Sequence, residues 1–446
     1  MSDTPQRPNI ILVNCDDLGY GDPACYGSTC HHTPALDRMA GEGLRFTDFY
    51  MAAPVCSPSR AAMMTGCYPQ RVGLETGCEI IVLRPGEPIG LSAEEITMAD
   101  ILKDAGYATR IIGKWHCGDQ PEFLPTRHGF DGWFGIPYSN DMGITARHPE
   151  LPPLPLMRDG EIVQEQPDQA ALTERYMEDA VQFIRQNRNI PFFLYLAHMY
   201  VHVPLYAPQR FLDQSQNGKY GATVEHVDWC MAVLFHELKR LGLDEDTLVI
   251  FTSDNGGAPR FGASNAPLRG AKGATWEGGM RVPCIMRWPG AIAPGTTCAQ
   301  VATAMDFLPT FARLAGKDAP SDRIIDGKDI RPLIQESANA ASPHDALYYY
   351  REHELQAVRA GEWKLHLITG ELYNLKEDIG ETSDVAGAHP DVVANLQEIA
   401  QTCRLDLGDS LTDTPGANRR PCGRVADPKP LTTYDPDHPY MVAMYD

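Results

Sequence analysis

The chain has 446 residues, of which 43% are hydrophobic and 22% are charged, and its formal net charge is −21. This balance is typical of a globular protein and excludes a disordered or fibrous chain. The negative charge argues against nucleic acid or an anionic membrane surface as a partner, and no apolar run approaches the ~20 residues that span a bilayer. The 12 cysteines show no repeating pair and are expected to be free thiols.

Apolar runs at residues 9–14, 191–196 and 247–252 predict three buried strands. Segments with helical periodicity predict helices at 33–43, 97–106, 169–189 and 223–242. Strands that alternate with helices indicate an α/β fold, with a mixed, mostly parallel sheet sandwiched by helices. In such a sheet, ligands bind at the carboxyl ends of the strands.

Two regions depart from this alternation. The proline-rich segment 148–167 predicts an inserted surface loop or hairpin. Beyond it, from residue 344 onward, short apolar segments separated by turn-length gaps predict a small antiparallel sheet, and the chain after Gly408 is expected to follow the surface as coil. We therefore expect a large α/β domain at 1–343 and a C-terminal subdomain at 344–446.

Polar side chains follow two of the predicted strands directly. Asp16 and Asp17 come after the first strand, and Asp254 and Asn255 come after the strand at 247–252. Two adjacent carboxylates alone are explained by a solvated turn, but the second pair adds oxygen ligands at the same edge of the sheet. An oxygen-only set favours a hard divalent cation, either calcium or magnesium, over zinc.

A cysteine lies next to a predicted helix start. Ser57 is a good N-cap, Pro58 a good first helical residue and Gly66 a good stop, so Cys56 is expected just before the helix, where backbone N–H groups favour anions. Arg60 lies one turn into this helix. A capped helix with a buried cysteine before it explains these residues equally well when they are taken alone.

The pattern Cys56-x-Pro58-x-Arg60, followed by Thr65 and Gly66, resembles the signature of the type I sulfatases, in which the cysteine is oxidised to formylglycine. The similarity extends over most of the chain and looks like the arylsulfatase A and N-acetylgalactosamine-6-sulfatase branch. It implies an alkaline-phosphatase-like fold. The other matching segments are 14–19, 113–116, 135–139, 202–204, 253–256, 272–273, 277–283 and the tail from 408 to 421.

The resemblance also implies a metal site. Its ligands are Asp16, Asp17, Asp254, Asn255 and residue 56 as formylglycine, and the expected ion is calcium, with magnesium as the alternative. The hydrate of the formylglycine aldehyde is the implied nucleophile. This agrees with physical chemistry, because a divalent cation lowers the pKa of a bound hydroxyl and stabilises charge on substrate oxygens.

Roles for the surrounding residues follow from the resemblance as well. Each residue has an ordinary structural explanation when taken singly, but their order and spacing together favour the family. When the sulfur is attacked, negative charge develops on the oxygen of the leaving alcohol, so such a site needs fixed cations and a proton donor. The implied roles are substrate binding by Lys114, Lys272 and Ser139, protonation of the leaving alcohol by His202 with help from Lys272, and support of formylglycine by Arg60 and His116.

We therefore expect a sulfatase that hydrolyses the sulfate ester of a small molecule or oligosaccharide, most simply a sulfated sugar, with aryl sulfates as surrogates. A formylglycine-generating enzyme is the implied maturation partner. The alternatives are a phosphonate or phosphate ester hydrolase and a sulfated-glycan binding protein in which Cys56 stays unconverted. Loop 141–167 and the C-terminal subdomain are expected to select the substrate.

Two features differ from the commonest members of the family. Ser57 replaces the frequent threonine after the cysteine, which leaves the signature intact. The residues after Met1 lack the apolar core of a secretory signal, so a cytoplasmic location is expected.

Overall fold

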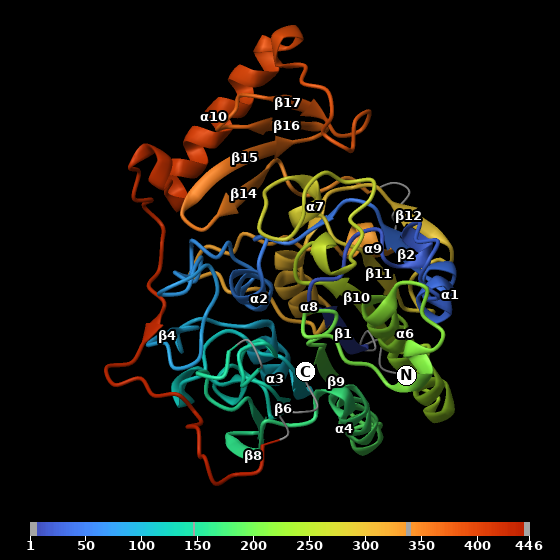
Figure 1. The fold of residues 1–446 in the computed structure, drawn as a ribbon. Coiled ribbons are helices and arrows are strands. Elements are labelled where there is room, and N and C mark those ends of the chain that lie inside the picture. The colour runs from blue at the N-terminus through green and yellow to red at the C-terminus, as the bar shows by residue number, and fades with distance from the viewer. Residues whose placement is uncertain (1–6, 146–147, 336–339, 441–446) are drawn as a thin grey trace.

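The computed structural model describes residues 7–145, 148–335 and 340–440. Its centre is a ten-stranded mixed sheet with helices on both faces (Figure 1). In spatial order the strands are β12 (Thr296–Cys298), β2 (Leu44–Phe46), β11 (Cys284–Arg287), β10 (Thr247–Ser253), β1 (Asn9–Cys15), β9 (Phe192–Ala197), β5 (Ala108–Gly113), β6 (Gly132–Gly135), β7 (Pro155–Arg158) and β8 (Glu161–Glu165).

The five central strands, β10, β1, β9, β5 and β6, are parallel, and antiparallel strands flank them on both sides. Strand β1 shows why its apolar run is continuous. Ile10 and Leu12 belong to one hydrophobic core, whereas Ile11 and Val13 belong to a second core on the other face. A strand that is buried on both faces needs apolar residues at successive positions, because neighbouring side chains point to opposite faces.

Helices cover both faces of the sheet. The first core includes side chains of α2, α3 and α8, and the second includes side chains of α1, α4 and α6. The helices are α1 (Pro34–Glu42), α2 (Cys56–Thr65), α3 (Met98–Asp104), α4 (Leu172–Gln186), α5 (Gln209–Leu212), α6 (Gly218–Leu241), α7 (Glu277–Met280), α8 (Phe307–Leu314), α9 (Arg331–Gln335) and α10 (Pro390–Leu407).

These elements confirm the predicted α/β class. The three predicted strands are β1, β9 and β10, and the predicted helices correspond to α1, α3, α4 and α6. Helix α6 begins at Gly218, five residues before the predicted start. The proline-rich segment forms the hairpin β7–β8, which extends the main sheet at its edge. Residues 146 and 147 of the predicted substrate loop 141–167 lie outside the described residues.

A separate antiparallel sheet of four strands lies near the C-terminus, as expected (Figure 1). The sequence analysis missed α10, which packs on this sheet through Leu396, Ala400, Cys403 and Leu407. The strands are β14 (Leu347–Arg351), β15 (Glu354–Ala360), β16 (Trp363–His366) and β17 (Leu372–Asn374). The domain boundary between residues 343 and 344 stays a prediction.

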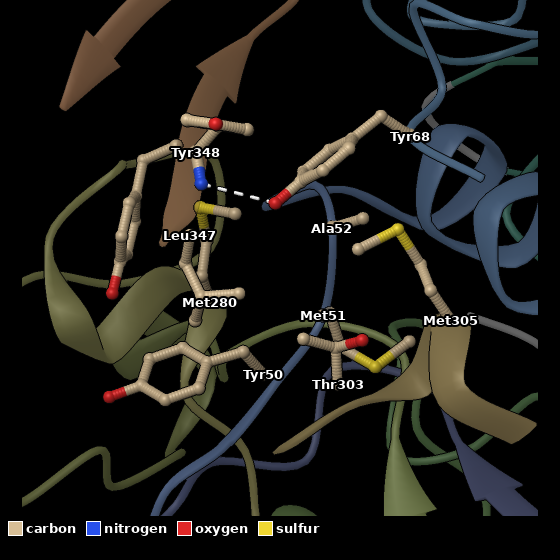
Figure 2. Close-up of a pocket in the computed structure, with 10 residues that line it drawn as sticks. Tyr50, Met51, Ala52, Tyr68, Met280, Thr303, Met305, Leu347 and Tyr348 are labelled. Carbon is tan, nitrogen blue, oxygen red and sulfur yellow. Dashed lines mark hydrogen bonds between the residues drawn. The ribbon is translucent and has the colours of Figure 1, made fainter. Parts of the chain in front are cut away.

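The small sheet packs against the segment that leads into α2. Figure 2 shows Leu347 and the Tyr348 backbone across from Met51, Ala52 and Tyr68. These residues line a void of about 10 Å³. The Tyr348 backbone N–H donates a hydrogen bond to the Tyr68 hydroxyl at 3.1 Å. A void of this size holds one water molecule at most, and its largely apolar lining favours a dry interior.

The tail after α10 runs back along the first third of the chain (Figure 1). Its short strand β18 (Gly423–Arg424) pairs with β4 (Ile89–Gly90), and Arg420 forms an ion pair with Glu95 at 2.6 Å. The tail is therefore mostly coil, as predicted, and is fixed to the body by specific contacts. Across the described part of the chain, no helix is long and apolar enough to span a bilayer.

Candidate active site

The carboxyl ends of β1 and β10 bring the predicted metal ligands together. These strands are parallel neighbours, and their register pairs Cys15 with Ser253, so the residues that follow them emerge side by side. The Asp17 backbone N–H donates a hydrogen bond to Asp254 Oδ1 at 3.3 Å. Asp17 has a φ of 63°, a left-handed conformation that is uncommon outside glycine and turns the chain sharply at the strand end.

Cys56 lies in the first turn of α2, which corrects the predicted cap. The helix begins at Cys56 itself, with the extended Val55 before it and Pro58 inside the first turn, where its missing N–H costs nothing. Ser57 is not the N-cap, and its hydroxyl accepts a hydrogen bond from the Leu83 backbone N–H at 3.0 Å. Gly66 ends the helix as predicted, with a φ of 68°.

The first turn of α2 points the Cys56 sulfur at the carboxylates. The Cys56 sulfur, one oxygen of Asp16 and one oxygen of Asp254 lie within 4.8 Å of one another. Arg60, one turn further on, donates from Nε to Asp254 Oδ2 at 2.8 Å, and its Nη2 lies 3.5 Å from Asp16 Oδ2. Lys114 Nζ forms an ion pair with Asp16 Oδ2.

Asp17 has a second group of neighbours. Lys272 Nζ lies 2.8 Å from Asp17 Oδ2, His202 Nε2 lies 3.8 Å from the same oxygen, and the Asn255 side-chain N–H donates to Asp17 Oδ1 at 2.7 Å. Ser139 Oγ lies 3.4 Å from His202 Nδ1. The six charged residues Asp16, Asp17, Asp254, Arg60, Lys114 and Lys272 are called the active-site cluster below.

His116 is buried beside this cluster and is held by a residue that the sequence analysis missed. Its Nε2 lies 3.0 Å from the carbonyl oxygen of Leu83. The Tyr195 hydroxyl, which accepts from Arg60 Nη1 at 3.4 Å, was missed as well. Tyr195 lies near the carboxyl end of β9, a position that could have identified it, whereas a backbone carbonyl leaves no signal in residue type.

Burial and mutual charge shift the pKa values of the two buried carboxyls in opposite directions. Burial and the charge of Asp16 raise the pKa of Asp254 to about 6. Burial acts on Asp16 too, but Lys114, His202 and Arg60 outweigh it and hold the pKa of Asp16 well below its usual range. Burial raises the pKa of the Cys56 thiol to about 11, so an unmodified Cys56 is a neutral thiol near pH 7.

The donor set fits a hard divalent cation. Asp16 Oδ1 and Asn255 Oδ1 are buried and have no hydrogen-bond partner among the described residues, which is rare for buried oxygen atoms and leaves them available to a metal ion. The three carboxylates and three cations of the active-site cluster cancel in charge. A bound divalent ion would therefore leave a net positive site, which suits an anionic substrate.

Comparisons with known proteins agree with this geometry. A family model described as Sulfatase matches residues 8–317. The chain belongs to the sulfatase family. A second model, described as N-sulphoglucosamine sulphohydrolase, C-terminal, matches residues 271–405 of this sulfatase.

Individual relatives cover most of the sulfatase. N-acetylgalactosamine-6-sulfatase of Rattus norvegicus is 42% identical over 389 residues, covering 82% of this chain and 72% of that protein. Arylsulfatase A of Homo sapiens is 36% identical over 493 residues, covering 96% of each. The solved structure of Ps i-CgsB in complex with k-i-k-neocarrahexaose superposes with a TM-score of 0.80 at 32% identity, covering 89% of this chain and 92% of that one.

These findings confirm the predicted family, the predicted fold and the predicted enzyme class. The sulfatase is a sulfuric ester hydrolase. The family implies a divalent metal and a formylglycine, and the buried acidic group around Asp16 supplies oxygen atoms for the metal. The identity of the ion, the state of residue 56 and the roles of single residues are proposals.

Proposed function

We propose that this sulfatase removes sulfate from a sulfated sugar and uses a formylglycine made from Cys56 together with a calcium ion. Two relatives support the sugar: one is named N-acetylgalactosamine-6-sulfatase, and Ps i-CgsB was solved with a neocarrahexaose. The observation that carries the proposal is the convergence of the Cys56 sulfur with the oxygens of Asp16 and Asp254, beside the cations of Arg60 and Lys114.

Asp16, Asp17, Asp254 and Asn255 would hold the cation, with residue 56 completing the site. A bound divalent ion lowers the pKa of a hydroxyl and offsets charge on sulfate oxygens. Oxygen-only ligands favour calcium, and magnesium is the other candidate. A formylglycine-generating enzyme would convert Cys56 beforehand.

The chain's own cations would bind and orient the sulfate group. Lys114 pairs with Asp16 and Lys272 with Asp17, so each of the two adjacent carboxylates has its own lysine. Charges fixed in a buried site stabilise developing negative charge more strongly than charges in water. Ser139, next to His202, would contact the sulfate or the nucleophile.

His202 is placed to donate the proton that the leaving alcohol needs. Its Nδ1 lies 2.5 Å from the Val203 carbonyl oxygen, which can only accept, so Nδ1 carries a hydrogen. Its Nε2 would therefore be the atom that donates the proton, and this atom lies 3.8 Å from Asp17 Oδ2, the oxygen that also pairs with Lys272. Asp254, with its pKa raised to about 6, would accept the proton of the attacking hydroxyl.

The decisive experiment compares an aryl sulfate with the matching aryl phosphate as substrates. The protein is co-produced with a formylglycine-generating enzyme, and conversion of residue 56 is measured by peptide mass spectrometry. We expect turnover of the sulfate ester that disappears in Cys56→Ala and persists in Cys78→Ala, because Cys78 is an exposed thiol outside the site. Hydrolysis of sulfated monosaccharides by the same preparation then tests whether the substrate is a sulfated sugar.

Two other outcomes would overturn the proposal. Faster turnover of the phosphate ester would favour the phosphonate and phosphate hydrolase alternative. Binding of sulfated sugars without turnover, by protein whose residue 56 is fully converted, would favour a binding protein. The cytoplasmic location stays a prediction and is tested separately by cell fractionation.

A further inference from the structure

The backbone N–H and C=O of Leu83 connect the helix that carries Cys56 with the ring of His116. Its N–H donates a hydrogen bond to Ser57 Oγ at 3.0 Å, and its carbonyl oxygen lies 3.0 Å from His116 Nε2. Ser57, Leu83 and His116 are all buried. The backbone of Leu83 therefore links Ser57, the residue after Cys56, to the imidazole of His116.

This contact determines which nitrogen of His116 carries the hydrogen. The Leu83 carbonyl can only accept, so Nε2 must be the donor. Burial and the charge of Lys114 hold the pKa of His116 well below its usual value, so the ring is neutral. Its Nδ1 then keeps a free lone pair, and it is buried without a hydrogen-bond partner among the described residues.

The loop that carries Leu83 is fastened on its far side. The Gly86 N–H donates to Asp119 Oδ2 at 2.6 Å, and β4, a few residues on, pairs with β18 of the tail. Toward α2, the hydrogen bond to Ser57 is the side-chain contact that holds the Leu83 N–H. Removing the Ser57 hydroxyl would therefore free the Leu83 peptide while the rest of the loop stays attached.

We infer that Ser57 is a positioning residue of the sulfatase: its hydroxyl fixes Leu83, and the Leu83 carbonyl fixes His116 as the Nε2–H tautomer with Nδ1 available to accept a proton. This inference rests on the proposed function for the role of His116 beside residue 56. The second position of Cys-x-Pro-x-Arg thereby has a structural role in the folded enzyme. Threonine also has a hydroxyl that can accept the Leu83 hydrogen bond, whereas alanine has none.

The first test uses unconverted protein, so that it does not depend on formylglycine. Two-bond proton–nitrogen correlations of labelled histidine report the tautomer of His116, whose signal is assigned by its absence in His116→Gln. We expect the wild type and Ser57→Thr to show only the Nε2–H form, and Ser57→Ala to show a mixture. Exchange of the Leu83 amide hydrogen should be on the order of tenfold faster in Ser57→Ala.

The second test measures steady-state kinetics of converted enzyme, normalised to the formylglycine content of each preparation. For Ser57→Ala we expect kcat to fall on the order of tenfold with KM unchanged, because misplacing a catalytic group weakens the transition state more than substrate binding. Ser57→Thr should restore kcat. The matched control is Thr76→Ala, which removes another hydroxyl contact of the same loop, to the Ile80 carbonyl, and should leave kcat unchanged.

An unchanged His116 tautomer and an unchanged Leu83 exchange rate in Ser57→Ala would overturn the inference. So would a kcat loss that Thr76→Ala reproduces or that Ser57→Thr fails to restore. If the tautomer changes as expected but wild-type enzyme with converted residue 56 leaves sulfate esters intact, the positioning contact stands and the proposed function fails.

Discussion

The protein buries two clusters of charged side chains that differ in how completely they are paired. The Glu277–Lys364 cluster, defined by Glu277, Lys364 and Glu381, joins the small C-terminal sheet to the main body. Lys364 Nζ lies 3.0 Å from Glu277 Oε1 and 2.9 Å from Glu381 Oε1, and all three residues are fully buried. Tyr349 and Tyr50 donate to the two oxygens of Glu277 at 2.9 and 2.5 Å.

The active-site cluster is also buried, except for the partly exposed Lys272, but this cluster and the adjacent Asn255 leave polar atoms without partners. Asp16 Oδ1 and Asn255 Oδ1 are unpaired among the described residues, whereas all polar side-chain atoms of Glu277, Lys364 and Glu381 have partners. A buried charge is tolerated only when it is paired or when it binds a ligand. Complete pairing thus indicates a structural role, and incomplete pairing indicates side chains that can bind an ion and a substrate.

A backbone hydrogen bond connects the two clusters. The Gly256 N–H, next to Asn255, donates to the Gly279 carbonyl at 2.9 Å, and Gly279 belongs to α7, which begins at Glu277. A Cβ at position 256 would lie 1.8 Å from the Gly278 carbonyl oxygen, so only glycine allows this approach. The contrast between the clusters can therefore be tested by substitutions at closely linked positions.

The largest expected effect is on catalysis. Asp254→Asn keeps the shape of the side chain but removes one charge from the active-site cluster, and we expect kcat/KM to fall on the order of 10³-fold. Because burial already disfavours the charged form of Asp254, the unfolding free energy of the metal-free variant should fall by no more than about 1 kcal/mol relative to wild type. Steady-state kinetics and urea denaturation in the presence of a chelator measure the two quantities.

The matched control is Asp246→Asn, at the opposite end of β10, which should retain full activity. A variant at position 254 that keeps wild-type kcat/KM, or that unfolds several kcal/mol more easily, would remove the distinction between the two clusters.

The opposite result is expected in the Glu277–Lys364 cluster. Lys364→Met leaves Glu277 and Glu381 buried without their shared cation, and breaking a buried pair in this way costs about 3–5 kcal/mol of unfolding free energy. Urea denaturation at constant pH measures the loss, and Lys376→Met, an exposed lysine just beyond β17, is the control. A loss no larger than that of the control would contradict the structural role of the cluster.

The two clusters should also differ in their response to pH. The pKa of Asp254 is raised to about 6, so calcium must displace a proton below that pH, and its Kd should rise about tenfold per pH unit there. Burial would raise the pKa of Glu277, but Lys364 and Arg281 hold it well below its usual range, so its stabilising charge persists throughout the same interval. Calorimetric titration between pH 5 and 8 measures the binding.

In metal-free protein, the raised pKa of Asp254 acts in the opposite direction on stability. Rising pH strengthens calcium binding but lowers the free energy of unfolding. A carboxyl whose pKa is higher in the folded than in the unfolded protein favours folding least when it is ionised. The unfolding free energy of chelator-treated protein should therefore fall as the pH rises from about 4 to about 6, and Asp254→Asn should lack this fall. In the calorimetric titration, a calcium Kd that stays constant below about pH 6 would show that Asp254 is not a calcium ligand.

The sequence predicted those parts of the protein that are encoded in residue type and period. The strands β1, β9 and β10 contain uninterrupted apolar runs at 10–13, 192–197 and 248–251, because both faces of the sheet are buried there. Helix α10 was missed although Leu396, Ala400, Cys403 and Leu407 recur at helical spacing and Pro390 stands at its start. The spacing and the proline are both visible in the sequence, so this helix was predictable from residue type and period.

Other features could not be predicted, because they depend on contacts distant in the chain. Ser57 has the residue type of an N-cap, yet the Leu83 N–H, 26 residues later, uses its hydroxyl. Lys364 and Glu277 are 87 residues apart, and neither residue alone indicates burial, since such charges are usually exposed. The candidate site residues were found through the family signature, whereas the backbone contact that orients His116 leaves no signature.

The return of the tail to the start of the chain has a consequence for biosynthesis. Arg71 donates to the Asn418 carbonyl, 347 residues later in the chain, and Arg420 pairs with Glu95 over a separation of 325. In a chain emerging from the ribosome, these contacts between the tail and residues 71–95 cannot form until residues 418–420 have been made. Cys56, which is buried in the finished protein, is therefore made hundreds of residues before the tail that closes over this part of the fold.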